Sequence, residues 1–238
     1  MPWPRPKGRF RLTKVGPMRT LILNFKNYPE VMGEGSVRLA EVAAKVAANS
    51  SVEVVVAPPV AMLGVVASRV KIPVFSQSLS DAVGDKTTGA NLPESARAAG
   101  AVGTLLNHSE ARVQVETLKS IIPRARQLGL RVCICANGVD EGAALSRLGS
   151  EYVAVEPPEL IGSGIAVSKA RPEVITRTVE AARAVGYRGA VLCGAGIVDG
   201  QDARRAVELG ADGILVASSV VRAKDWEAKI ADLAHSLE

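Results

Sequence analysis

The segment TLILNFKNYPEVMGEGSVRLAEVAAKVAANSSVEVVVA, residues 20–57, contains the unit from which the fold can be inferred. It starts with the apolar run 20–24 and ends with the apolar run 52–57. Between these runs, apolar side chains recur at helical spacing while charged residues occupy another face, and the apolar set is Leu39, Val42 and Val46. The segment therefore predicts a strand, an amphipathic helix and a second strand.

Runs of the same kind recur along the whole chain, separated by stretches with helical periodicity. They are TLILN (20–24), VEVVVA (52–57), VFS (74–76), AVGTLL (101–106), RVCICA (131–136), YVAV (152–155), GAVLC (189–193) and GILVA (213–217). Continuous apolar strands are typical of a parallel sheet that helices cover on both sides. Eight such units favour an α/β protein that forms a closed (β/α)8 barrel, with a doubly wound open sheet as the structural alternative.

Length and composition fit one barrel domain. The chain has 238 residues, of which 47% are hydrophobic, and we expect the barrel over residues 18–238. Residues 1–17 are basic and rich in proline without the apolar core of a secretory signal, so we expect a disordered extension. No apolar run is long enough to span a membrane, which argues against a membrane protein.

Charge and cysteine content exclude some classes of partner and compartment. The net charge of +5 lies largely in the N-terminal extension, and only three Phe and three Tyr are available for stacking, which argues against nucleic-acid binding. The three cysteines are an odd number, and we expect Cys133 and Cys135 to lie on opposite faces of one strand, unable to bridge. The odd number of cysteines and the expected lack of a bridge between Cys133 and Cys135 favour a reducing cytoplasm.

Polar residues follow three of the predicted strands at the end where a barrel carries its active site. Asn24 and Lys26 follow the first strand, His108 the fourth and Glu156 the sixth. A carboxylate can act as a base, an imidazole can polarise a carbonyl, and an ammonium can stabilise developing negative charge. The set suits proton transfer between adjacent carbons.

Four motifs resemble the signatures of the triosephosphate isomerase family, in the family's order. They are Asn24-x-Lys26, His108-Ser109-Glu110, Glu156-Pro157 followed by Ile161-Gly162-Ser163-Gly164, and Cys193-Gly194-Ala195-Gly196. The match extends over nearly all of residues 18–238 and is closest to the short archaeal-type branch. The resemblance implies a TIM barrel that interconverts dihydroxyacetone phosphate and glyceraldehyde 3-phosphate.

The resemblance also implies a role for each polar residue. Glu156 is expected to be the base, His108 a neutral electrophile and Lys26 the cation, while Asn24 shapes the site. Ser109 and Glu110 are expected to open a helix whose positive end keeps His108 unprotonated. Glu110 would then be a supporting carboxylate behind the site.

Phosphate binding and a lid are implied in the same way. Backbone N–H groups near Ile161, Gly162, Gly196, Ala217 and Ser218 are expected to hold the phosphate. Well-known family members have a serine in place of Gly196 and paired glycines in place of Ala217 and Ser218. The lid is expected from Pro157 to Ser168, with Pro158 at one hinge, Gly162 and Gly164 at its tip, and Glu159 where the family often has tryptophan.

No metal or organic cofactor is implied, because the cysteines and histidines do not show a ligand spacing. The expected partners are a triose phosphate and further copies of the chain, as a tetramer in preference to a dimer. Thr87-Thr88-Gly89 resembles the loop by which family members contact a neighbouring subunit. Two alternatives remain open: another phosphate-binding barrel from amino-acid or cofactor biosynthesis, and a catalytically silent barrel used for binding.

Overall fold

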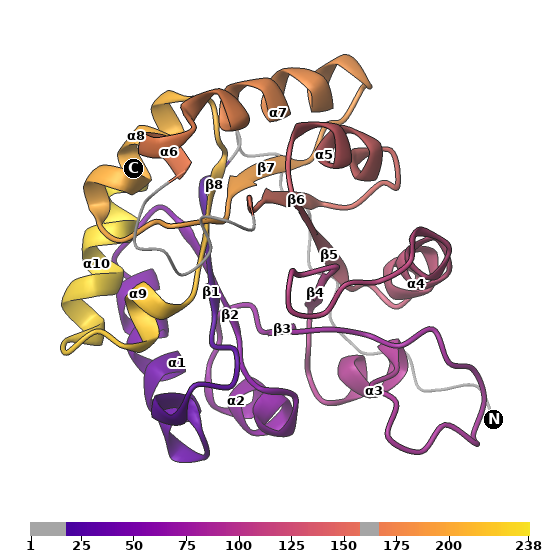
Figure 1. Cartoon of the computed structure of the whole chain (residues 1–238). Helices are drawn as coiled ribbons and strands as arrows, with labels where there is room; N and C mark the ends of the chain where they lie inside the picture. Colours follow the sequence, from indigo (N-terminus) through magenta and orange to yellow (C-terminus); the bar gives the residue numbers. More distant parts are fainter. Residues whose placement is uncertain (1–17, 158–166) are drawn as a thin grey trace.

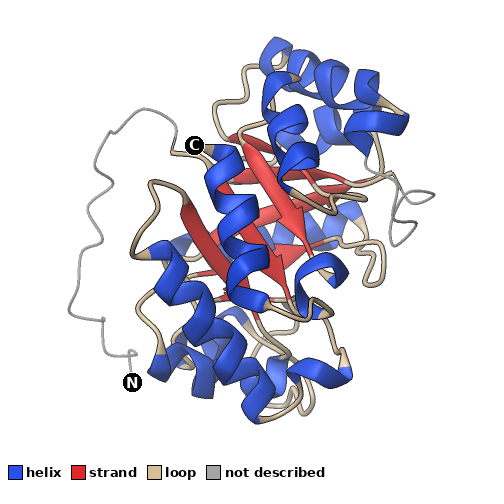
Figure 2. Cartoon of the chain, turned by 90° about the vertical axis from the view of Figure 1, so that its left-hand side faces the viewer, coloured by secondary structure: helices blue, strands red, loops and turns tan. Residues whose placement is uncertain are grey.

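The computed structural model describes residues 18–157 and 167–238, in which strands and helices alternate along the chain (Figure 1). The strands are β1 (Thr20–Asn24), β2 (Glu53–Ala57), β3 (Phe75–Ser76), β4 (Gly103–Leu106), β5 (Arg131–Ala136), β6 (Tyr152–Val155), β7 (Ala190–Cys193) and β8 (Gly213–Val216). The α-helices are α1 (Glu34–Ala47), α2 (Leu63–Arg69), α3 (Pro93–Ala98), α4 (Val115–Gln127), α5 (Val139–Ser146), α6 (Val167–Ala170), α7 (Pro172–Ala184), α8 (Gly200–Glu208), α9 (Ser218–Val221) and α10 (Trp226–Leu237). Short 3-10 turns are η1 (Pro29–Val31) and η2 (Val60–Met62). Figure 2 shows the strands inside a surrounding layer of helices.

The strands form one parallel sheet that closes on itself. Its order is β2-β1-β8-β7-β6-β5-β4-β3, so β1 pairs with both the second strand and the last. The strands at the two ends of this order are β2 and β3. They meet through a parallel bridge between Val56 in β2 and Val74, next to β3, and a 3.0 Å hydrogen bond from the Val56 N–H to the Pro73 carbonyl. This arrangement confirms the (β/α)8 TIM barrel and is contrary to the doubly wound open sheet.

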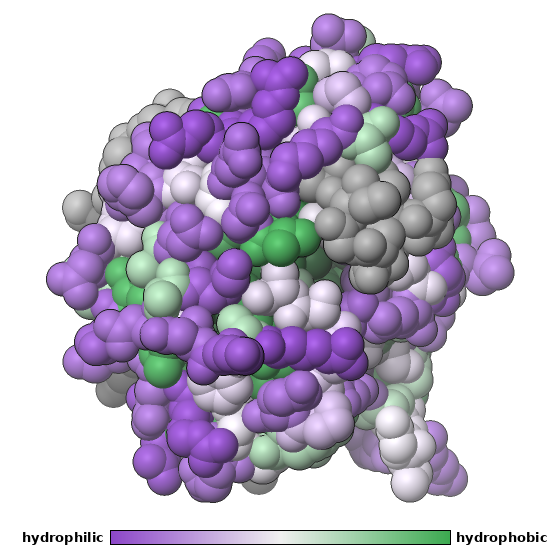
Figure 3. All heavy atoms as spheres, turned by 60° about the vertical axis from the view of Figure 1, so that its left-hand side comes forward, coloured by the Kyte–Doolittle hydropathy of each residue, from purple (hydrophilic) through white to green (hydrophobic). Residues whose placement is uncertain are grey.

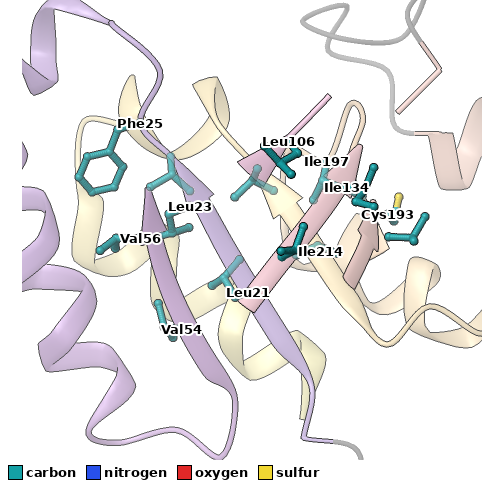
Figure 4. Close-up of a cluster of buried hydrophobic side chains, with 14 of the residues drawn as sticks. Leu21, Leu23, Phe25, Val54, Val56, Leu106, Ile134, Cys193, Ile197 and Ile214 are labelled. Carbon is teal, nitrogen blue, oxygen red and sulfur yellow. The ribbon is translucent and has the colours of Figure 1, made fainter. Parts of the chain in front are cut away.

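Side chains alternate between two buried layers. One layer packs between the sheet and the helices, and several of its members are labelled in Figure 4. The other fills the barrel interior and consists of Ile22, Val55, Ala57, Phe75, Leu105, Cys133, Cys135, Tyr152, Ala154, Leu192 and Leu215. The expectation that Cys133 and Cys135 lie on opposite faces was therefore wrong, because residues two apart on a strand share a face.

The helices bury the faces that their periodicity predicted. In α1, Leu39 and Val46 are buried and Val42 is half-buried. In α4, the buried residues are Leu118, Ile121, Ile122 and Ala125. None of the helices within the described ranges is long and apolar enough to cross a membrane.

A polar network fills the end of the barrel where the strands begin. Arg131 Nη1 lies 2.8 Å from Glu53 Oε1 and donates a 2.6 Å hydrogen bond to the Tyr152 hydroxyl. Tyr152 in turn donates a 2.9 Å hydrogen bond to Glu53. The Arg131 guanidinium also lies 5.2 Å from the centre of the Phe75 ring. These contacts close that end of the barrel and leave the opposite end for the site.

The close pairing of β1 and β8 gives a stability prediction. A Cβ at Gly213 would lie 2.0 Å from the Thr20 carbonyl oxygen, which is backbone and cannot rotate away. We expect Gly213→Ala to lower the free energy of unfolding by about 2 kcal/mol, measured by urea or thermal unfolding at fixed protein concentration. The matched control is Gly138→Ala, since a Cβ at Gly138 would meet nothing within 4 Å. Equal unfolding midpoints for the two variants would contradict the proposed clash.

Candidate active site

A cavity of about 290 Å³ opens at the ends of β1, β4, β6, β7 and β8. Its lining is Lys26, Tyr28, His108, Glu156, Gly194, Gly196, Ile197, Val198, Leu215, Val216, Ala217, Ser218, Ser219 and Arg222. The space-filling view in Figure 3 shows a hollow with hydrophobic residues at its edge and mainly hydrophilic residues around it. The three residues predicted to carry the chemistry therefore share one cavity, although they come from distant parts of the chain.

Glu156 is a buried carboxylate at the end of β6. Its residue is 2% exposed, and Oε2 has no hydrogen-bond partner among the described residues. Burial raises the pKa of Glu156 to about 7, because a carboxylate loses its hydration inside the protein, and hydrogen bonding from the Cys135 thiol and the charge of Lys26 oppose this rise. A carboxyl with a pKa near neutrality can both accept and return a proton.

The Glu156 side chain occupies space that only a glycine at position 194 leaves open. A Cβ at Gly194 would lie 2.4 Å from Glu156 Cγ and 2.9 Å from its Oε1. Gly194 directly follows β7, so the turn after that strand forms one wall of the carboxylate's position. The glycine of the Cys193-Gly194-Ala195-Gly196 motif therefore has a steric role that its sequence context did not reveal.

His108 lies at the end of β4 with its ring facing the carboxylate. Its Nε2 is 3.8 Å from Glu156 Oε2, and its Nδ1 accepts a 3.1 Å hydrogen bond from the Glu110 N–H. Because Nδ1 is an acceptor, a neutral ring carries its proton on Nε2. Burial is the largest cause of a lowered pKa of His108, and the positive charges of Lys26 and Arg112 lower it further. The ring is therefore neutral near pH 7.

The expected reason for this neutrality was wrong. Ser109 and Glu110 form a turn, closed by a 2.8 Å hydrogen bond from the Ala111 N–H to the His108 carbonyl. The following helix, α4, begins only at Val115. Thus burial, neighbouring cations and one backbone N–H keep the ring neutral, and a helix N-terminus does not.

Both the side chain and the backbone of Lys26 have polar partners. Its Nζ lies 2.6 Å from Glu110 Oε1, and its backbone N–H donates a 3.0 Å hydrogen bond to the Asn24 side chain. The backbone of Lys26 has a φ of 48°, a left-handed conformation that residues other than glycine rarely adopt. Gln77 stabilises this loop by donating a 3.0 Å hydrogen bond to the Lys26 carbonyl.

Asn107 orients the loop that carries His108, a role that the sequence did not suggest. It has a φ of 61°, and its side chain donates a 2.9 Å hydrogen bond to the Cys135 carbonyl. The same side chain accepts a 3.1 Å hydrogen bond from the Val113 N–H. Asparagine tolerates left-handed backbone, and this was the available signal in the sequence.

Of the residues expected to bind phosphate or to form the lid, some are described by the structure and others lie outside the described residues. Gly196, with a φ of 72°, and Ala217 and Ser218 line the cavity beside Glu156, and α9 begins at Ser218. Pro157 and Ser168 are described and buried. Pro158, Glu159, Ile161, Gly162 and Gly164 lie outside the described residues, so the expectations for the lid tip stay predictions.

The cavity contains further residues that the sequence did not single out for the site, namely Tyr28, Ile197, Val198, Leu215, Val216, Ser219 and Arg222. All three cysteines are buried and free. Across residues 18–157 and 167–238, no group of three His, Cys, Asp or Glu side chains could hold a metal ion.

Comparisons with known proteins identify the family of this chain. The family model described as "Triosephosphate isomerase" matches residues 19–234. A triosephosphate isomerase of Methanopyrus kandleri is 48% identical over 220 residues, which cover 92% of this chain and 97% of that protein. Those of Methanosarcina barkeri and Caldivirga maquilingensis are 46% and 44% identical over 213 and 217 residues, covering 90% and 91% of this chain and 96% of each relative. The cavity with its glutamate, histidine and lysine thus lies in a chain that belongs to the triosephosphate isomerase family.

Proposed function

We propose that Glu156, His108 and Lys26 together interconvert dihydroxyacetone phosphate and glyceraldehyde 3-phosphate in this cavity. The observation that carries the proposal is the 3.8 Å separation of His108 Nε2 and Glu156 Oε2 in a cavity that Lys26 also lines. The activity follows from membership of the family, and the contacts support the assignment of roles.

In the proposed reaction, the Glu156 carboxylate removes a proton from the carbon next to the substrate carbonyl. The C–H electron pair forms the carbon–carbon double bond, and the carbonyl π electrons move to oxygen. His108 donates a hydrogen bond from Nε2–H to that oxygen, and the Lys26 ammonium stabilises the negative charge of the enediolate. The hydroxyl proton of the first carbon then passes to the former carbonyl oxygen through the hydrogen-bonded Nε2 of His108. The lone pair of the resulting oxyanion forms the new carbonyl on the first carbon, and the electron pair of the double bond takes the proton of Glu156 at the former carbonyl carbon.

The phosphate is proposed to lie against the backbone of Gly196, Ala217 and Ser218. This position is supported by their place on the cavity wall beside Glu156 and by the left-handed conformation of Gly196. Backbone N–H groups in such turns bind anions without a charged side chain. This chain has Gly196 in place of the family's serine and Ala217 and Ser218 in place of its paired glycines. These replacements keep the backbone N–H groups, so this mode of binding is retained.

The assembly is proposed to be a homotetramer in the cytoplasm. The loop that contains Thr87, Thr88 and Gly89 also contains Val83, whose side chain is among the most exposed large hydrophobic groups at 80%. An exposed valine next to the segment that resembles the family's contact loop supports burial against another copy.

We expect light scattering to give four times the chain mass of 24.8 kDa. A monomer at micromolar concentration would contradict the proposal.

Shortening the proposed base tests the catalytic assignment. Glu156→Asp withdraws the carboxylate by about 1 Å, and we expect kcat to fall roughly 100-fold, because proton transfer depends steeply on position. The assay follows conversion of dihydroxyacetone phosphate through a coupled dehydrogenase. Glu180→Asp makes the same change at an exposed position on α7 and should leave kcat unaltered. If Glu156→Asp kept kcat within threefold, Glu156 would not be the base.

The pKa of Glu156 predicts the pH profile. Since the base must be ionised and its pKa is about 7, kcat/KM should decrease about tenfold per pH unit below 7 and level off above it. Because the pKa of His108 is lowered, its protonation lies on the acid side of the profile and adds no alkaline limb. Substrate phosphate titrates near pH 6, so the profile is measured with glyceraldehyde 3-phosphate and with D-glyceraldehyde, which lacks phosphate. A flat profile for D-glyceraldehyde between pH 6 and 8 would refute the assignment.

A further inference from the structure

Arg222 is a second cation that lines the cavity besides Lys26. It directly follows α9 and is therefore close in sequence to Ala217 and Ser218, which line the same cavity. Lys26 already forms a 2.6 Å ion pair with Glu110, so its charge is partly compensated. The cavity thus has one cation engaged with a carboxylate on the β1 side and a second cation on the β8 side.

The Arg222 side chain is held at the rim by an aromatic ring. Its guanidinium carbon lies 4.6 Å from the centre of the Tyr28 ring, a cation–π arrangement, and Tyr28 also lines the cavity. Its Nε lies 4.0 Å from Glu30 Oε1, at the limit of an ion pair. With 61% of the side chain exposed, Arg222 is open to solvent while its guanidinium contacts the Tyr28 ring.

An anion that approaches this mouth meets opposing charges. Glu156 inside and Glu110 beside Lys26 repel it, and Glu30 reduces the attraction of Arg222. A triose phosphate carries a charge of about −1.5 to −2 at neutral pH. A cation at the rim, next to the low-dielectric wall of the cavity, attracts such a ligand before backbone contacts form.

We infer that Arg222 is a specificity-determining residue that draws the phosphate group into the cavity and favours phosphorylated over unphosphorylated trioses. This inference rests on the proposed phosphate position at Gly196, Ala217 and Ser218. Arg222 acts by charge at the rim, and it takes no part in proton transfer.

The test compares Arg222→Gln, Arg222→Lys and the control Lys224→Gln, after circular dichroism has shown that each variant is folded. Lys224 is exposed and does not line the cavity; it lines a neighbouring hollow that shares Ser218, Ser219 and Arg222 with the cavity. Each variant is assayed with glyceraldehyde 3-phosphate over a series of salt concentrations and with D-glyceraldehyde. One unit charge acting on a dianion across about 9 Å of water corresponds to roughly a fivefold change in the binding constant.

We expect Arg222→Gln to lower kcat/KM for glyceraldehyde 3-phosphate about 3- to 10-fold at low ionic strength, mainly through KM. The deficit should shrink toward 1 M salt, where the Debye length is about 3 Å. Turnover of D-glyceraldehyde should be unchanged, Arg222→Lys should restore most of the loss, and Lys224→Gln should have less than a twofold effect.

Three results would overturn the inference. They are an unchanged kcat/KM in Arg222→Gln, an equal loss with both substrates, and a loss that salt does not reduce. The second result would show that the contact with Tyr28 merely packs the two loops. Failure of the proposed function is distinguishable, because it would appear as normal turnover by Glu156→Asp whatever the Arg222 variants do.

Discussion

The site depends on keeping one carboxylate out of water. Glu156 is 2% exposed at the end of β6, and burial raises its pKa to about 7. A carboxyl whose pKa is higher in the folded state than in the unfolded state stabilises the fold below its ordinary pKa, and this contribution is lost as pH rises through 7. The buried carboxylate therefore makes the fold less stable at neutral pH than at acid pH, a cost that the proposed role of Glu156 as the base would explain.

The neighbours of Glu156 limit this cost without removing it. Lys26 and the Cys135 thiol favour the ionised form, while Glu110 opposes it. Lys26 also lowers the pKa of His108, so one ammonium favours a charged carboxylate and a neutral imidazole at the same time. The roles proposed for Glu156 as base and His108 as uncharged hydrogen-bond donor require this division of protonation states.

The two ends of the barrel are built differently, with a side-chain network at one end and loops with left-handed backbone at the other. The network of Arg131, Glu53 and Tyr152 fills the end where the strands begin. At the opposite end, Lys26 and Asn107 have left-handed backbone conformations, each stabilised by side-chain hydrogen bonds. Strain of this kind persists only where surrounding contacts specify it, and here those contacts orient the two loops that carry Lys26 and His108.

The sequence by itself determined the barrel and the identity of the chemical groups. Apolar runs bounded all eight strands to within two residues, since a strand that is buried on both faces needs a continuous apolar run, and the motifs marked Lys26, His108 and Glu156. Tertiary structure alone decided how these groups behave. The neutral state of His108 comes from burial and from Lys26, which is 82 residues away in the chain, although a local helix had been expected. Likewise, Arg222 meets Tyr28 only because β8 pairs with β1. Local spacing cannot report these effects, because solvation and Coulomb interaction depend on which distant segments surround a group.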